Sequence, residues 1–183
     1  MKKMKINEIF YSIQGEGYWT GTPMIFIRFS GCNLKCPFCD TDHSAYSEMD
    51  IDGILGNLAG FGQCKRICIT GGEPSIQLDK ELVRALHEKG FLIHVETNGT
   101  NKLPDGIDWT TVSPKTENIA LESADELKIV YQGQDVSKWE HFPAQVRYLQ
   151  PCSCRNTEEV VSFVMRNPLW RLSLQTQKYL DIR

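Results

Sequence analysis

The fold of this chain is constrained most by a series of short apolar runs, each ending in glycine, cysteine or small polar residues. Residues 24–29 are rich in β-branched and aromatic side chains and lead into Ser30-Gly31-Cys32, and residues 66–69 lead into Thr70-Gly71-Gly72. Runs of this kind predict β-strands. They occur at residues 24–29, 66–69, 91–95, 109–112, 127–130 and 146–149.

Helical segments lie between the predicted strands. In the clearest one, Leu82 and Leu86 recur at helical spacing, and Gly90 follows as a stop signal. Strands that alternate with helices indicate parallel βαβ units and an α/β fold. The helices are expected over residues 51–58, 79–89 and 157–166, the last with Thr157 as its N-cap.

This α/β pattern predicts a single domain built as an open, partial (β/α)6-type barrel. Six strands are too few for the complete eightfold barrel, which typically needs about 250 residues, whereas this chain has 183. A doubly wound open sheet is the second candidate. In both folds the carboxyl ends of the strands form the active-site face, so the residues that follow the strands are expected to lie there.

Charge and hydropathy exclude several classes of function. Lys and Arg total 20 against 23 Asp and Glu, and no basic block occurs, so a nucleic-acid surface is not expected. No run of about 18 apolar residues occurs, which excludes a membrane-spanning helix. Residues 6–11 contain Asn7 and Glu8 and do not form a signal-peptide core. We therefore expect a cytoplasmic protein without a membrane or nucleic-acid partner.

Three of the seven cysteines, Cys32, Cys36 and Cys39, follow the first predicted strand on one short loop. Iron–sulfur clusters are normally held by four Cys thiolates. Three thiolates would leave one iron open to an exogenous ligand, as catalytic metal sites do. The alternative is a zinc knuckle with His43 as its fourth ligand. Two features argue against it: the triplet follows a buried-looking strand directly, and a Gly-Gly-Glu-Pro element ends the next strand.

The C-x3-C-x2-C spacing resembles the radical S-adenosylmethionine (SAM) superfamily, and Gly-Gly-Glu-Pro at 71–74 looks like its SAM-amine-binding element. Within that superfamily the chain resembles the 7-carboxy-7-deazaguanine synthases from about Asn7 to Tyr179, with the motifs in family order. These motifs include Gln-Gly-Glu-Gly at 14–17, Cys-Asp-Thr at 39–41, Glu-Thr-Asn-Gly at 96–99, Ser-Pro-Lys at 113–115 and Leu-Ser-Leu-Gln at 172–175.

This resemblance implies an enzyme that converts 6-carboxy-5,6,7,8-tetrahydropterin into 7-carboxy-7-deazaguanine with loss of ammonia, in the route to queuosine and related deazapurines. One 4Fe-4S cluster would bind SAM at its free iron, and reductive cleavage of SAM would give the radical that starts the ring contraction. The family also implies a magnesium ion, a homodimer and a reductant such as flavodoxin. Its modified partial barrel agrees with the strand count.

The resemblance also assigns roles to residues of this chain that match the family's motifs. Cys32, Cys36 and Cys39 would ligate the cluster, and Thr41 would ligate magnesium. SAM would be bound by Phe38, Cys39, Asp40, Gly72, Glu73, Ser113, Pro114, Lys115, Gln150 and Ser153. The substrate would be bound by Ile13, Gln14, Gly15, Glu16, Arg28, Thr70 and Gln175. The domain would span 1–183, with a cluster loop at 30–41 and a C-terminal segment, 170–183, that closes the substrate site.

Some of these assignments compete with structural roles. Arg28 interrupts an apolar run, where an unpaired charge is costly. The substrate carboxylate suits its bidentate guanidinium, and a structural partner such as Glu8 or Asp40 is the alternative. Thr41 could instead cap the loop through a backbone hydrogen bond. The segment at 14–17 could be a solvated hairpin turn.

Several features have no place in the family pattern. Cys64, Cys68, Cys152 and Cys154 match no motif and are expected to be free thiols. The interval between the cysteine loop and the second strand is short, so an insertion that helps an electron donor dock is absent or reduced. The chain ends in Arg183, whereas some family members bring a terminal proline to the substrate.

Two other functions remain as alternatives. A glycyl-radical-enzyme activating protein shares the C-x3-C-x2-C spacing but must admit a protein loop, which does not call for the segments at 14–17 and 39–41. A zinc-binding adaptor without catalysis has little need for polar residues at so many strand ends.

Overall fold

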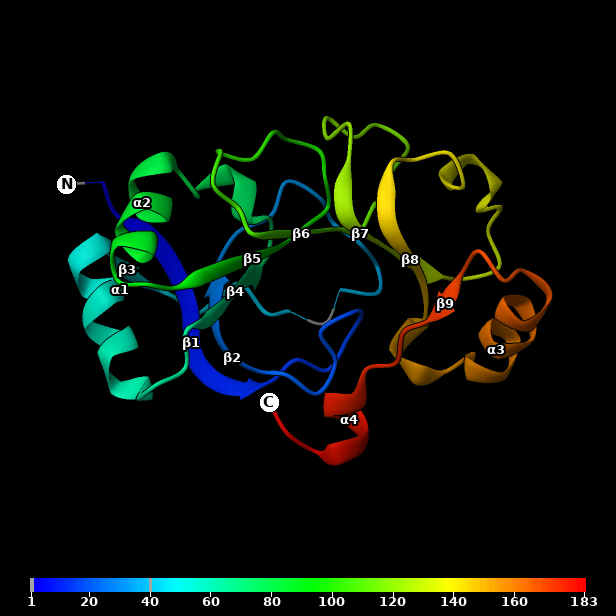
Figure 1. Cartoon of the computed structure of the whole chain (residues 1–183), viewed down its shortest axis with the longest axis horizontal. Helices are drawn as coiled ribbons and strands as arrows, with labels where there is room; N and C mark the ends of the chain where they lie inside the picture. Colours follow the sequence, from blue (N-terminus) through cyan, green and yellow to red (C-terminus); the bar gives the residue numbers. More distant parts are fainter. Residues whose placement is uncertain (1, 40) are drawn as a thin grey trace.

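In the computed structural model, which describes residues 2–39 and 41–183, the sheet has nine strands in the order β3-β1-β2-β4-β5-β6-β7-β8-β9 (Figure 1). A hairpin starts this sheet. β1 (Met4–Ile13) runs antiparallel to β2 (Pro23–Phe29), and β3 (Ser47–Met49) pairs with the other edge of β1.

From β2 onward, each strand lies parallel to the one before it and follows it in chain order. A doubly wound sheet would reverse this order at one point. The continuous order and the curvature seen in Figure 1 therefore confirm an open α/β barrel-like sheet. The parallel strands are β4 (Arg66–Gly71), β5 (Leu92–Thr97), β6 (Trp109–Val112), β7 (Ala124–Tyr131), β8 (Ala144–Pro151) and β9 (Arg171–Leu172).

The helices cover the outer face of the curved sheet. α1 (Ile51–Leu58) packs against β3 and α2 (Lys80–Glu88) packs against β5, while α3 (Thr157–Arg166) packs against β8 and β9 (Figure 1). Their buried residues form two apolar clusters with the strands, one around β2, β4 and β5 and the other around β7 and β8. No helix among the described residues is long and apolar enough to cross a membrane.

Helix ends follow local capping chemistry. The Asp50 carboxylate accepts from the amide of Gly53 at the start of α1, and Asp79 does the same for Leu82 in α2. The expectation that Thr157 is an N-cap is wrong by one residue. Thr157 is the first helical residue of α3, and Asn156 occupies the cap position without a side-chain cap bond.

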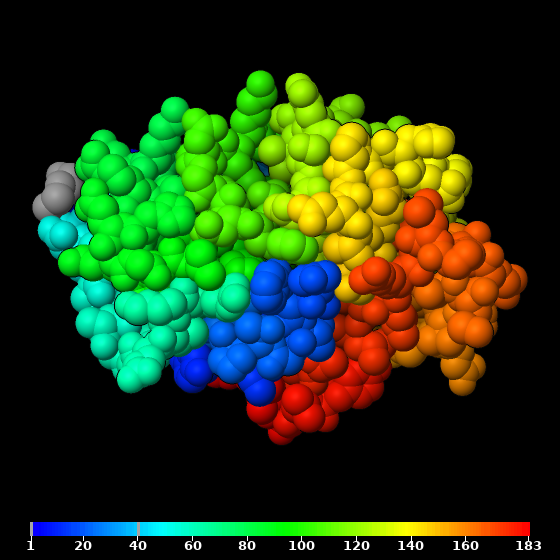
Figure 2. All heavy atoms as spheres, viewed as in Figure 1, coloured from blue at the N-terminus to red at the C-terminus, as the bar shows by residue number. Residues whose placement is uncertain are grey.

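The C-terminal segment packs against the loop after β1. α4 (Thr176–Leu180) follows β9, and the amide of Thr176 donates to the carbonyl of Gly15 at 3.0 Å. In the space-filling view, the blue N-terminal segment and the red C-terminal segment lie side by side in the middle of the molecule (Figure 2). Because the loop after β1 enters the inner side of the sheet, this contact fixes one wall of the cavity described next.

Candidate active site

A cavity of about 280 Å³ lies at the carboxyl ends of the strands, as the sequence predicted. Its walls come from the loops after β1, β2, β4, β5, β6 and β8, from β7, and from the C-terminal segment. Most of the residues assigned by family resemblance line it. These are Ile13, Gln14, Gly15, Glu16, Arg28, Cys32, Cys36, Phe38, Cys39, Thr41, Thr70, Gly72, Ser113, Lys115, Gln150, Ser153 and Gln175.

Two of the predicted SAM contacts are not part of the cavity lining. Glu73 and Pro114 do not line it, although their neighbours Gly72, Ser113 and Lys115 do. Asp40 lies outside the described residues.

The cysteine loop forms one side of the cavity. Its three thiols are near enough to influence each other's ionisation. The pKa of Cys36 is raised, mainly by burial and also by the neighbouring Cys32 and Cys39, and the cation of Lys115 opposes this rise. A cation beside thiols favours the thiolate form that metals bind. Three thiols on one loop that face one cavity therefore fit a cluster held by three thiolates.

Across residues 2–39 and 41–183, no three His, Cys, Asp or Glu side chains converge as ligands of a single metal ion do. The three thiolates of a cubane bind different irons, so they do not need to converge in that way. His43 lines the cavity, and both its ring nitrogens are buried without a partner among the described residues.

A closed ring of hydrogen bonds ties the cysteine loop to the end of β5. Asn33, next to Cys32, donates from its amide to the hydroxyl of Thr100 at 2.8 Å. Thr100 donates to the Asn98 side-chain oxygen at 2.7 Å, and Asn98 donates back to Asn33 at 3.0 Å. Every donor in this ring has an acceptor, so the base of the loop is held by side chains as well as by backbone.

The Gly-Gly-Glu-Pro turn packs directly against the start of the cysteine loop. The amide of Gly72 donates to the carbonyl of Phe29 at 3.0 Å, and that of Glu73 donates to the carbonyl of Gly31 at 2.9 Å. A Cβ on Gly72 would lie 1.9 Å from the Gly31 carbonyl oxygen. Only glycine allows this approach, and it brings residue 72 to the wall of the cavity.

The carboxylate of Glu73 is fully buried and is occupied by protein donors. It accepts from the Thr97 hydroxyl at 2.6 Å, from the backbone amide of Asn98 at 2.7 Å and from the backbone amide of Ser75 at 3.0 Å. Glu73 therefore joins the turn after β4 to the end of β5. The carboxylate of Glu73 thus has a positioning role in the structure, and a SAM contact by this residue stays a prediction.

The opposite wall carries Lys115, whose ammonium donates to the carbonyl and the hydroxyl of Ser113. Burial lowers the pKa of Lys115, and the nearby Lys128 lowers it further.

Just after β8, Ser153 and Cys154 have φ values of 49° and 62°. Non-glycine residues in this region are strained and tend to occur at functional sites.

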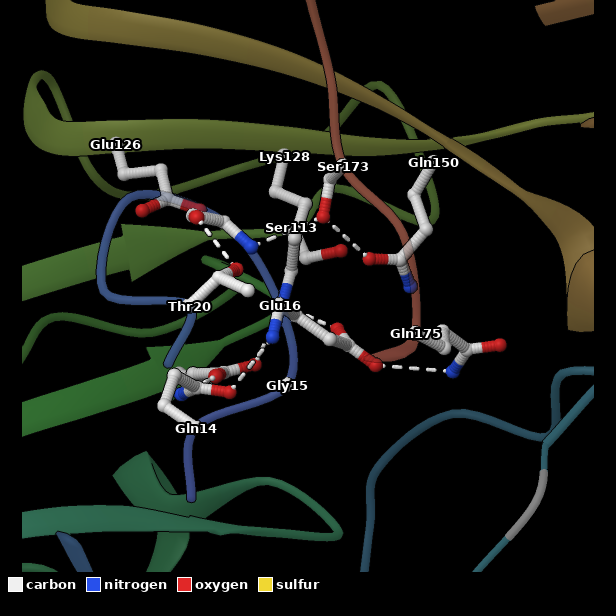
Figure 3. A network of polar contacts seen from close by, with 12 residues as sticks. Gln14, Gly15, Glu16, Thr20, Ser113, Glu126, Lys128, Gln150, Ser173 and Gln175 are labelled. Carbon is white, nitrogen blue, oxygen red and sulfur yellow. Dashed lines mark hydrogen bonds and ion pairs between the residues drawn. The ribbon is translucent and has the colours of Figure 1, made fainter. Parts of the chain in front are cut away.

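The floor of the cavity is an ion-pair network centred on Lys128 of β7 (Figure 3). Its ammonium lies 2.6 Å from Glu16 and 2.8 Å from Glu96. Burial alone would raise the pKa of Glu16, but Lys128, together with hydrogen bonds such as that from Gln175, lowers it to about 2. Glu16 is thus an ionised carboxylate within the chain, so the segment at 14–17 is not simply a solvated turn.

Arg28 lies in an ion pair with Glu8, with 2.9 Å between Nε and a carboxylate oxygen. Both side chains are about a quarter exposed, and Arg28 also lines the cavity. Arg183 pairs with the second oxygen of Glu8. The structural partner considered for Arg28 is therefore present, and the guanidinium still reaches the cavity.

The sequence interpretation missed Glu96, Asn98 and Lys128 as residues of this cavity. Lys128 carried the same signal as Arg28, because it is a charge within an otherwise apolar strand, Leu127-Lys128-Ile129-Val130. Such a charge needs a partner. Which partner it meets depends on how the sheet curves, which residue patterns do not specify.

Comparison with known proteins agrees with this geometry. Residues 26–138 match the family model of the radical SAM superfamily. A 7-carboxy-7-deazaguanine synthase from Bacteroides thetaiotaomicron is 55% identical over 180 residues, covering 98% of each chain. One from Nitratidesulfovibrio vulgaris is 38% identical, covering 97% of this chain and 98% of that protein. The crystal structure of QueE from Escherichia coli gives a TM-score of 0.81 at 29% identity, covering 94% of this chain and 93% of that one.

These similarities extend over nearly the whole chain and include every strand that contributes to the cavity. They favour this family over the two alternative functions, a glycyl-radical-enzyme activating protein and a zinc-binding adaptor. The chain belongs to the radical SAM superfamily and, within it, to the 7-carboxy-7-deazaguanine synthases, the enzymes with that activity in queuosine and deazapurine biosynthesis.

Proposed function

We propose that this synthase converts 6-carboxy-5,6,7,8-tetrahydropterin into 7-carboxy-7-deazaguanine, with loss of ammonia, in the cavity described above. The observation that carries the proposal is that one cavity combines three thiols on a loop with a floor of paired charges. The thiols suit a cluster, and the polar floor suits a ligand rich in hydrogen-bond donors.

The test is an anaerobic incubation of the reconstituted protein with SAM, dithionite and the carboxypterin, followed by mass spectrometry. We expect 7-carboxy-7-deazaguanine to accumulate while SAM is regenerated in each turnover. Reconstituted protein that cleaves SAM but leaves the carboxypterin unchanged would contradict the proposed substrate.

As a radical SAM enzyme, the chain uses a 4Fe-4S cluster and SAM. When bound, the two supply a 5′-deoxyadenosyl radical that starts the reaction by removing hydrogen from the substrate. We assign Cys32, Cys36 and Cys39 as the cluster ligands. The ring of Asn33, Thr100 and Asn98 would hold the loop in place, as its hydrogen bonds indicate.

For SAM we propose contacts on two sides of the cavity. Gly72 would meet the amine, since it lines the cavity next to the cysteine loop. Lys115 and Ser113 would meet the carboxylate or the ribose from the opposite wall. The remaining proposed contacts that line the cavity are Phe38, Cys39, Gln150 and Ser153.

For the pterin we propose contacts around the loop after β1. Glu16 would accept from the amino-pyrimidine donors, since its carboxylate is ionised and lies at the cavity floor. The backbone and amide groups of neighbouring residues would complete this edge, and Arg28 would bind the carboxylate. The other proposed contacts are Ile13, Gln14, Gly15, Thr70 and Gln175.

Arg28→Ala is expected to weaken carboxypterin binding at least about tenfold and to leave SAM binding unchanged. A charge-assisted pair costs roughly 2–5 kcal/mol when one partner is removed and the other stays buried. Substrate titration at saturating SAM measures this effect. Arg28→Lys is expected to recover part of the loss, because it keeps the charge without the bidentate fork.

The variant Glu8→Gln distinguishes substrate binding by Arg28 from a structural role in which Arg28 only pairs with Glu8. It removes the partner of Arg28 and leaves the guanidinium at the cavity. If Arg28 served mainly to pair with Glu8, Glu8→Gln would weaken carboxypterin binding as much as Arg28→Ala does. We expect a much smaller effect from Glu8→Gln.

We also propose a magnesium ion that takes the Thr41 hydroxyl as its protein ligand. Thr41 lines the cavity next to the cysteine loop, and Mg²⁺ commonly takes few protein ligands and several from substrate and water. Thr41→Ala is expected to keep the cluster and uncoupled SAM cleavage but to lose most of the stimulation of product formation by magnesium. Thr41→Ser should retain it. Unchanged stimulation in Thr41→Ala, with lower stability, would return Thr41 to a loop-capping role.

Other features of the assembled enzyme are also proposals. We propose that residues 1–183 act as one radical SAM core domain, with the cluster loop at 30–41 and a C-terminal segment, 170–183, that closes the substrate site. Contacts between α4 and the loop after β1 support the role of that segment. On the basis of the family resemblance, we further propose that the enzyme is a homodimer in the cytoplasm. We propose a donor such as flavodoxin as the source of the electron for its cluster.

A further inference from the structure

Lys128 is buried beneath the cavity between two carboxylates from distant parts of the chain. Glu16 belongs to the loop after β1, and Glu96 belongs to β5. The side chain of Lys128 is only 3% exposed, against 15% for Glu16 and 22% for Glu96. All three residues line the cavity, but the Lys128 side chain is almost completely shielded, whereas the two carboxylates are more exposed. Figure 3 shows Lys128 beside Glu16.

Each carboxylate is fixed at both of its oxygens. One oxygen of Glu16 accepts from the ammonium of Lys128, and the other accepts from the side-chain amides of Gln175 at 2.9 Å and Gln177 at 3.2 Å. Glu96 gives one oxygen to Lys128 and accepts at the other from Gln14 at 2.9 Å. Two carboxylates held this close repel each other, and a shared proton would replace the cation if the cation were removed.

The other charges around the network do not replace Lys128. Burial raises the pKa of Glu126 to about 7, and that of the Cys68 thiol well above its usual value. The ammonium of Lys115 is bonded to Ser113. The titratable and charged groups that face the network are Arg28 in β2, Cys68 in β4, His94 in β5, Lys115 after β6, Glu126 in β7 and Lys178 in α4.

We propose that Lys128 is a positioning residue for the pterin: its ammonium pairs with Glu16 and Glu96 and holds both carboxylates in place, so that they offer acceptors to the N–H donors of the amino-pyrimidine ring. This inference rests on the proposed function of the cavity. It assigns the recognition of that ring to a pair of carboxylates with one buried cation between them.

The proposal predicts a pH dependence that appears only when the cation is removed. In the wild type, Glu16 has a pKa of about 2 and stays ionised at neutral pH, and Glu126, whose pKa is about 7, does not line the cavity, so ligand affinity should be nearly flat there. In Lys128→Met, burial and mutual repulsion place a proton on the pair. Ligand binding must then release that proton, and affinity should rise toward about tenfold per pH unit as pH increases.

The experiment measures binding of 7-carboxy-7-deazaguanine to the reconstituted enzyme with SAM between about pH 6 and pH 8. This product keeps the amino-pyrimidine ring. We expect less than about a twofold change in wild type, and in Lys128→Met a loss of at least about tenfold near pH 6 that diminishes as pH rises. Lys128→Arg should keep the flat profile, and SAM affinity should be unchanged. Lys138→Met, which removes an exposed lysine that pairs with Glu117, is the matched control.

The possible outcomes separate the inference from the function on which it rests. No binding of the deazaguanine by wild type would overturn the proposed function. Binding by wild type together with a flat profile in Lys128→Met would overturn the role of Lys128 alone. If Lys128→Met does not fold, Lys128→Met/Glu16→Gln/Glu96→Gln removes the cation together with both carboxylates and leaves no buried unpaired charge in the network. This triple variant has no carboxylate pair left to titrate and should show a flat profile, and a steep profile in it would overturn the proposal.

Discussion

Cys36→Ala is expected to lose most of its iron and all SAM cleavage. The variant leaves two thiolates on the loop, and a cubane that normally takes four Cys ligands is held poorly by two. Cys36 lines the cavity together with Cys32 and Cys39. Iron content after anaerobic reconstitution and formation of 5′-deoxyadenosine with dithionite measure the two effects, against about four irons per chain in wild type.

Cys64→Ser is the matched control for this prediction. Cys64 is a half-buried thiol that does not line the cavity, and its Sγ lies near the carbonyls of Pro23 and Arg66. The variant should keep the iron content and the SAM cleavage of wild type. A full complement of iron in Cys36→Ala, or its loss in Cys64→Ser, would show that the ligand assignment is wrong.

Gly72→Ala is expected to lower both the stability of the protein and its affinity for SAM. The new Cβ would lie 1.9 Å from the carbonyl oxygen of Gly31 and 2.4 Å from its carbonyl carbon. Both are backbone atoms, so the turn and the start of the cysteine loop must move apart. Overpacking of this kind costs roughly 1–3 kcal/mol of stability. We also expect at least about a tenfold loss of SAM affinity, because the displaced backbone lies at the cavity wall.

Gly56→Ala provides the comparison. Gly56 is exposed in α1, and a Cβ there would meet nothing within 4 Å. Since glycine is unfavourable inside a helix, this variant should gain about 0.5–1 kcal/mol in the free energy of unfolding. Chemical denaturation and SAM titration of both variants test the pair. Equal stability and equal SAM affinity in Gly72→Ala and wild type would mean that the turn can relax without disturbing the site.

The positions of the strands and the face that carries the site could be predicted from the sequence because both depend on local patterns. A β-branched run followed by glycine or cysteine marks the carboxyl end of a strand, and parallel strands bring those ends together. β1 was harder to recognise. Lys5, Asn7 and Glu8 interrupt its apolar residues, and its pairing with β2 depends on a partner outside the segment.

The roles of individual side chains were less accessible than the position of the site. Resemblance placed Glu73 among the SAM contacts, whereas its carboxylate is occupied by Thr97, Asn98 and Ser75. Similarly, Arg28 and Lys128 are both charges in apolar strands, and only the curvature of the sheet decides that one meets Glu8 and the other meets Glu16 and Glu96. Such pairings join residues that are far apart in the chain, and no local pattern encodes them.

The contact between the C-terminal segment and the loop after β1 has a consequence for the order in which the protein forms during synthesis. The loop that carries Glu16 leaves the ribosome early, but the side chain of Gln175, to which it is bonded, is 159 residues further along. Ser173 likewise accepts from the amide of Gly17 across 156 residues. While the chain is still being made, the strands from β4 to β9 can pair one after another in chain order, because each of them from β5 onward lies beside the one before it. The wall around Glu16 is completed only when the last segment is released, so a nascent chain holds a nearly complete sheet before it holds a pterin site.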